Sequence, residues 1–446
     1  MSRRLAILAT LALVALAAAG ASFSNASFTT ASSTSVQVSS SPVTMDTLAI
    51  NSGNSQTTTV GLAVAVAPSV KVTDKNGNPV SGLAVTFAVA SGGGSATSVN
   101  ATTNASGIAT VGSWTLGTTK GANTLTASAA GLIGSPVTFA ATGIAGVASK
   151  YVVTSSSYSP VAGTAVTVLA QVTDQYGNAI ASSGRSVTWS KTGTGGTFTT
   201  NPTVTGASGI ATATFTTGTT VSTYTITGTS TGLTGTSTSI VSIAGAATKI
   251  AVNTGNSQTT TVGTDVPIDP SVKLTDANSN PVPGVGVTFV VATGGGSATS
   301  VNATTNASGI ATVGSWTLGT VTGSNTLTVT KAGLTGSPIT FTATGKADVC
   351  TQYLVTSSSY NPTHSTAVTI SAQRADQYGN TVPGAGFVVT WSKTGTGGSF
   401  ASGTSTTAST GKATVSFTVS STVGMVHTVT GTTGTTAGTS PNITTK

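Results

Sequence analysis

The sequence predicts an all-β protein made of four tandem antiparallel β-sandwich domains. Three observations predict it. The composition favours strands, apolar residues alternate with polar ones in short runs, and the pattern recurs about every 100 residues. Thr, Ser, Ala and Val accompany 55 glycines, Glu is absent, and only 5% of the 446 residues are charged. Such a chain is poor in strong helix formers and rich in residues that suit a pleated sheet.

The N-terminus has the pattern of a signal peptide. Two arginines precede an apolar run from Leu5 to Leu16, and small residues follow as far as Ala21. The run is short for a membrane span, although an uncleaved anchor is the alternative. We therefore expect residues 1–21 to be cleaved and residues 22–45 to form a Ser/Thr-rich linker or an extended strand. No later segment is apolar enough to span a membrane once the signal peptide is removed.

Internal duplication sets the order of the domains. The segment from Gly92 to Thr118 recurs unchanged from Gly294 to Thr320, an offset of 202 residues. Each of the two long units is itself double, because a weaker copy of its strand-turn pattern follows after about 100 residues. The order is therefore A, B, A′, B′, in a rod-like array. The predicted domains are residues 46–143, 147–245, 248–345 and 352–446.

Each repeat contains strand patterns separated by turn residues. Between Val166 and Val172, apolar side chains alternate with Thr, Leu and Gln, as expected for a strand with one buried face. A loop of the form Asp-x-x-Gly-Asn, or a close variant, follows such a strand in every repeat, and its residues favour turns. The four loop aspartates are Asp74, Asp174, Asp276 and Asp376. About seven short strands in about 100 residues indicate an Ig-like sandwich.

One large aromatic residue is expected at the centre of each core. The strand after the loop carries Trp189 and Trp391 in the B repeats, and Phe87 and Phe289 in the A repeats. Arg374 is unusual, because Val172 holds the equivalent inward position. Its guanidinium is expected either to reach water from the strand end or to turn outward at a bulge.

The repeat pattern resembles a known family. Val70 to Phe87 reads Val-x-Val-x-Asp-x-x-Gly-Asn-Pro-Val-x-Gly-x-x-Val-Thr-Phe, and it is followed by Gly-Gly-Gly-Ser, Gly-x-Ala-Thr, Trp-x-Leu-Gly and Asn-Thr-Leu-Thr. This arrangement is similar to the bacterial Ig-like domains of group 1 (Big-1), the invasin/intimin type. The third repeat matches equally well and the second and fourth match more loosely. The resemblance covers nearly the whole chain after residue 45.

The resemblance implies a secreted or cell-surface structural and adhesive protein, in which tandem Ig-like domains act as spacers. Its expected partner is a surface receptor, a glycan or a neighbouring subunit, whose identity the sequence leaves open. One alternative is a subunit of an extracellular fibre or matrix, with Ser22–Pro42 adding a strand to a neighbour. Another is a carbohydrate-binding accessory protein.

The sequence favours no enzyme, cofactor, metal site or nucleic-acid site. Without Glu, paired-carboxylate chemistry would need two Asp, and the loop aspartates lie in separate repeats. His364 and His427 could be imagined in a triad with Asp376, but no nucleophile motif supports one. Cys350 could join two chains or be an inert small residue. The net charge of +8 is scattered, whereas nucleic-acid binders cluster their basic residues.

Calcium is the one metal that the loop residues could suit. Calcium prefers oxygen ligands, and each loop offers one Asp among Asn and Gly residues. Turn formation explains the same residues fully.

Overall fold

A computed structural model describes residues 46–446. The expected signal peptide (1–21) and linker or extended strand (22–45) lie outside the described residues. Within residues 46–446 the regular elements are all β-strands, and none of that region is a helix able to cross a membrane. The strands form four sandwiches, each around its own cluster of buried hydrophobic residues. The all-β prediction is therefore confirmed, while the domain limits drawn from the sequence stay a prediction.

The first and third sandwiches share one topology. In the first, sheets β1-β3-β7 and β2-β10-β9-β4-β6 enclose the core, and β5 pairs with β8; the third repeats this order from β21 to β30. The strands of the first are β1 Thr47–Ser52, β2 Gln56–Thr59, β3 Ser69–Thr73, β4 Ala84–Ser91, β5 Gly94–Thr97, β6 Asn100–Thr102, β7 Ile108–Thr110, β8 Ser113–Leu116, β9 Gly121–Ser128 and β10 Val137–Ile144. Those of the third are β21 Lys249–Thr254, β22 Gln258–Thr261, β23 Ser271–Thr275, β24 Gly286–Thr293, β25 Ser297–Thr299, β26 Asn302–Thr304, β27 Ile310–Thr312, β28 Ser315–Thr317, β29 Gly323–Thr330 and β30 Ile339–Lys346.

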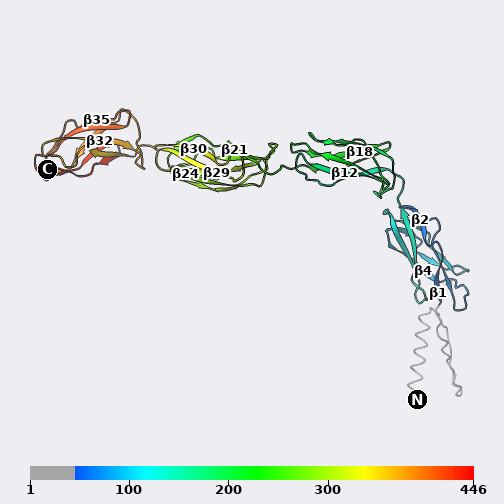
Figure 1. Ribbon diagram of the computed structural model, residues 1–446. Helices are drawn as coiled ribbons and strands as arrows, with labels where there is room; N and C mark the ends of the chain where they lie inside the picture. Colours follow the sequence, from blue (N-terminus) through cyan, green and yellow to red (C-terminus); the bar gives the residue numbers. More distant parts are fainter. Residues whose placement is uncertain (1–45) are drawn as a thin grey trace, which may run out of the picture. The chain divides into compact units, whose positions relative to one another are not determined.

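The second and fourth sandwiches share another topology. In the second, sheet β11-β12-β16-β14 faces sheet β15-β13-β18-β19, and β17 pairs with β20; Figure 1 shows β12 and β18 in the two layers. The strands of the second are β11 Lys150–Ser155, β12 Ala165–Thr173, β13 Ser186–Lys191, β14 Thr197–Phe198, β15 Thr203–Val204, β16 Ile210–Thr216, β17 Thr223–Tyr224, β18 Ile226–Ser230, β19 Leu233–Thr236 and β20 Ile240–Val241. Those of the fourth are β31 Gln352–Ser357, β32 Ala367–Ala375, β33 Val388–Lys393, β34 Ser399–Phe400, β35 Thr404–Thr406, β36 Lys412–Thr418, β37 Val426–His427, β38 Val429–Thr433, β39 Thr436–Thr439 and β40 Ile443–Thr444.

Alternation along the strands produces these layers. On β12, Val166, Val168, Ala170 and Val172 are buried, while Thr167 is exposed. A period of two places one face in the core and the other toward water. The pairing is antiparallel except that β2 runs parallel to β10, and β22 to β30. This parallel pair closes one edge of the larger sheet in the first and third sandwiches.

The expected aromatic residues lie in the cores. Trp189 on β13 and Trp391 on β33 are buried, and each indole Nε1 donates to a hydroxyl on the neighbouring strand, at 2.8 and 2.9 Å. In the first and third sandwiches, the buried Phe of the equivalent strand is joined by a second large residue, Trp114 on β8 or Trp316 on β28. The two repeat types therefore fill the same kind of core from different strands.

Candidate functional site

The Asp-x-x-Gly-Asn loops, in which Ser279 replaces the glycine in the third sandwich, have the same internal hydrogen bonds in all four sandwiches. In the third, Oδ1 of Asp276 accepts bonds from the backbone amides of Asn278 and Asn280, at 2.9 and 2.8 Å. Oδ2 accepts a bond from Nδ2 of Asn280 at 2.9 Å. An aspartate that binds amides further along its own chain closes a turn. Equivalent bonds form around Asp74, Asp174 and Asp376.

In the second, third and fourth sandwiches, the same carboxylate also holds the linker that leads into the sandwich. Oδ2 of the loop aspartate accepts a further bond from a linker amide that lies 28 or 31 residues earlier in the chain. The pairs are Asp174 with Gly146 at 3.0 Å, Asp276 with Gly245 at 2.9 Å and Asp376 with Asp348 at 3.1 Å. Bonds to a charged carboxylate are stronger than neutral ones, so each linker is fixed just before its first strand.

The asparagine at the end of the loop binds the preceding sandwich. At the junction of the second and third sandwiches, Nδ2 of Asn280 donates to the backbone oxygen of Thr219 at 2.8 Å, and Oδ1 accepts from the amide of Val221 at 2.9 Å. The junction of the third and fourth repeats this pattern. There Asn380 donates to Thr320 O at 2.7 Å and accepts from Thr322 N at 2.9 Å. One amide side chain thus serves its own turn and the neighbouring domain.

A tyrosine adds a close contact at the junction of the third and fourth sandwiches. The hydroxyl of Tyr378 lies against the backbone of Gly263, where an added Cβ would come within 2.9 Å of that oxygen. Glycine permits this approach because it has no side chain. The loop of the fourth sandwich therefore contacts the third through both Asn380 and Tyr378.

Burial and hydrogen bonding act in opposite directions on these carboxyl groups. Burial raises the pKa of Asp276, but bonds from the Asn280 side chain and the amides of Gly245, Asn280 and Asn278 lower it more, to below the ordinary 3.8. Asp174 and Asp376 have pKa values lowered by the same balance. These three side chains are therefore charged at neutral pH, where their oxygens accept hydrogen bonds best.

The geometry does not favour calcium at these loops. Each of the three buried carboxylates accepts four hydrogen bonds, which matches the number of its lone-pair positions. A cation would have to displace N–H donors that point at the same oxygens. Among residues 46–446, no three His, Cys, Asp or Glu side chains come together as a metal site. The loop aspartates are thus turn and junction residues.

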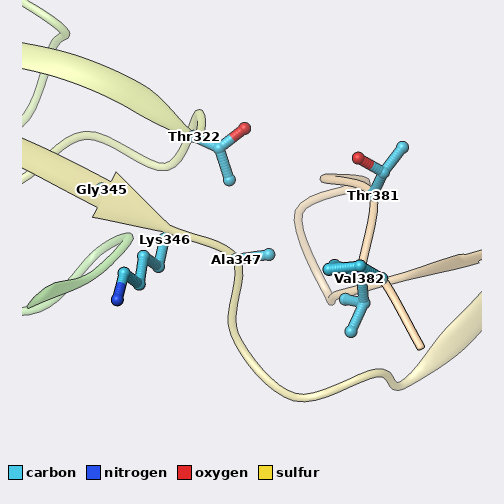
Figure 2. Close-up of a pocket in the computed structure, with 7 residues that line it drawn as sticks. Thr322, Gly345, Lys346, Ala347, Thr381 and Val382 are labelled. Atoms are coloured by element: carbon cyan, nitrogen blue, oxygen red, sulfur yellow. The ribbon is translucent and has the colours of Figure 1, made fainter. Parts of the chain in front are cut away.

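A shallow groove of about 430 Å³ lies between the third and fourth sandwiches (Figure 2). Figure 2 shows Ala347 pointing across it toward Val382, while the side chain of Lys346 turns away. The other lining residues are Thr322, Gly345, Thr381 and Pro383. Lys346 is the one titratable residue among those that line the groove, and the other side chains offer hydroxyl, methyl and methylene groups.

The histidines considered for a triad are not assembled with Asp376. His364 is exposed, and His427 is buried with both ring nitrogens bonded to backbone atoms. Both carboxylate oxygens of Asp376 accept hydrogen bonds from its own loop or from the linker.

Two other residues singled out from the sequence lie together near the start of the fourth sandwich. Arg374 shows no bulge, since the pairing of β31 with β32 continues without a register shift. Its guanidinium stacks on Phe387 at 3.7 Å and donates to Pro383 O at 3.0 Å. Cys350 is a free thiol, and it lines a hollow of about 270 Å³ with Arg374 and Tyr353.

Comparison with known proteins finds similarity to solved structures only. No family model and no curated protein matches the sequence. Similar solved structures include the Escherichia coli adhesin FdeC, with 16% identity and a TM-score of 0.41 over 68% of this chain and 99% of that one. Invasin, a bacterial integrin-binding protein, is 17% identical with a TM-score of 0.34, covering 90% and 79%. InvD of Yersinia pseudotuberculosis is 17% identical with a TM-score of 0.39, covering 66% and 96%. At such identities the likeness concerns the fold and carries no receptor with it.

Proposed function

We propose that this chain is a secreted or cell-surface structural and adhesive protein whose tandem Ig-like sandwiches act as spacers. The observation that supports this most is the construction of the junctions. At two successive junctions, the Asp-Asn loop of one sandwich binds both the linker and the end of the sandwich before it. A spacer needs such bonds, because an unfixed short linker would leave each domain free to swing.

The same bonds support a structural role for these loops. The carboxylates of the junction loops are occupied by turn and linker amides, and the groove between the third and fourth sandwiches has Lys346 as its one titratable lining residue. Recognition of a receptor, a glycan or a neighbouring subunit would then use exposed loops and strand edges.

Small-angle X-ray scattering of the full chain tests the spacer role. We expect the wild type to scatter as a chain with restricted domain motion, and the double variant Asn280→Asp, Asn380→Asp to become flexible. Each change removes the Nδ2 donor and places a second carboxylate beside the loop aspartate. Asn78→Asp is the matched control, because Asn78 is exposed in the first sandwich. Identical scattering from the double variant and the wild type would contradict the proposal.

Cell fractionation tests the proposed location, and a deletion tests how the chain assembles. We expect the protein in the medium or the envelope of the producing cell.

The deletion removes residues 22–42. If the chain is a spacer, its assembly state should not change. Loss of polymers after that deletion would support the fibre subunit instead.

A further inference from the structure

His427 occupies a closed site in the fourth sandwich. It lies on β37 and has no exposed surface. Its Nδ1 lies 3.0 Å from the backbone oxygen of Thr394, and its Nε2 lies 3.4 Å from the backbone amide of Ser420. A carbonyl oxygen only accepts and an amide only donates, so the ring must carry its proton on Nδ1 and none on Nε2. The site therefore suits a neutral histidine.

The second sandwich fills the equivalent site with tyrosine. The hydroxyl of Tyr224 donates to the backbone oxygen of Thr194 and accepts from the amide of Gly218, both at 2.9 Å. Its ring meets Phe215 edge-on at 5.2 Å, as His427 meets Phe417 at 5.3 Å. In each of the two sandwiches, a single buried side chain therefore donates to a backbone oxygen and accepts from a backbone amide. Tyrosine does both without gaining charge in mild acid, whereas histidine is the side chain that gains a proton there.

The segments around His427 contribute no carboxylate side chain that could neutralise a positive charge. The neighbouring β33 ends at Lys393, whose Nζ donates to Gly395 O at 3.0 Å, and β36 begins at the exposed Lys412. Strands β34, β37, β38 and β40 contribute no charged side chain, and the residues around β40 add only the exposed His364 and Lys446. No Asp or Glu occurs from residue 377 to residue 446. The charged side chains that these segments contribute are therefore lysines, which cannot neutralise an imidazolium.

We propose that His427 makes the fourth sandwich acid-labile, while the second sandwich is not. A proton on Nε2 would oppose the N–H of Ser420, remove one hydrogen bond and leave a charge in the core. The unfolded chain takes up that proton freely in water. Since unfolding then binds a proton, the stability of the fourth sandwich falls as the pH falls. Strand β37 pairs with β40, so mild acid loosens the C-terminal part of this sandwich first.

Hydrogen exchange of the full chain, followed by mass spectrometry and corrected for intrinsic rates, tests this between about pH 7.5 and about pH 5. In peptides from residues 412–446, we expect the opening equilibrium to rise by up to about tenfold per pH unit, the limit for one proton. Peptides from residues 210–243 of the second sandwich should not respond.

Two exchanges between the sandwiches complete the test. His427→Tyr should abolish the acid response of the fourth sandwich, and Tyr224→His should transfer the response to the second. If His427→Tyr does not fold at neutral pH, the wild-type comparison and Tyr224→His still decide the matter. Equal responses of both wild-type sandwiches, or an unchanged response in His427→Tyr, would overturn the proposal.

Discussion

The first and third sandwiches share most of their sequence and one topology, yet their Asp-Asn loops lie in different surroundings. Asp74 is partly exposed and Asn78 is exposed, whereas Asp276 and Asn280 are only 6% and 3% exposed. Both aspartates make the same three bonds to their own loop. Asp276 also accepts the linker bond from Gly245, and Asn280 also binds the second sandwich. The segment that leads into the first sandwich lies outside the described residues 46–446.

This difference teaches that one turn motif has two uses. The internal bonds close the turn after a strand wherever the loop occurs. Where a linker and a neighbouring domain lie beside the loop, the same aspartate and asparagine also bind them. For the loop aspartate and the loop asparagine, the first sandwich therefore provides a comparison inside the chain.

The largest expected effect comes from removing the carboxylate. Asp276→Ala leaves three backbone amides and the Asn280 side chain without their acceptor, and a buried unpaired donor costs about 1–3 kcal/mol. Allowing for relaxation, we expect the third sandwich to lose about 3 kcal/mol. Asp74→Ala should affect the first sandwich far less, since water reaches its loop.

Calorimetry of the full chain, with hydrogen exchange to assign each transition to a sandwich, measures both variants. Equal losses from Asp276→Ala and Asp74→Ala would show that the junction adds nothing to the turn.

The fold could be predicted from the sequence because strand alternation and turn residues are local signals. Between Val166 and Val172 every second residue is apolar, and these residues are the ones that the structure buries. Trp189 and Trp391 could be assigned to cores because they follow a recognisable turn. Trp114 was visible within a motif, but its four-residue strand gives too short a pattern to reveal full burial.

The junction role could not be predicted, because its partners are distant and are backbone atoms. Asn280 binds backbone atoms about 60 positions earlier. Almost any residue type at those positions would supply the same backbone amide and oxygen. The one available signal was that Asn ends the loop in every repeat, which a turn alone also explains. His427 was likewise visible only as an isolated histidine, since the matching site of Tyr224 requires the fold.

A smaller effect is expected when the loop carboxylates are protonated. Their folded pKa values lie below the ordinary 3.8, so the stabilisation is complete above the unfolded pKa and is lost as the pH falls through the folded pKa. A protonated carboxyl group still accepts some bonds, so the loss is smaller than in Asp276→Ala. Below about pH 4, domain motion should therefore increase at the junctions.

Scattering measured at about pH 5 and about pH 3 tests this, and the double variant below separates the carboxylates from the histidines, which both proteins retain. The double variant Asp276→Asn, Asp376→Asn lacks the two titrating groups at the described junctions and should change less than the wild type. A wild type whose scattering is the same at both pH values would contradict the role of the charged carboxylates.

The smallest expected effect separates the turn from the junction. The third loop has Ser279 at a φ of 68°, where the other three loops have glycine, and L-residues are disfavoured in this left-handed region. Ser279→Gly should stabilise the third sandwich by about 0.5 kcal/mol, and Gly379→Ser should destabilise the fourth by a similar amount. Thermal unfolding of the full chain measures both, while scattering should show unchanged junctions, because neither side chain takes part in the bonds between sandwiches. If Ser279→Gly instead loosens the junction, turn geometry and domain docking are coupled, and the comparison of the first and third loops would have to treat them as one unit.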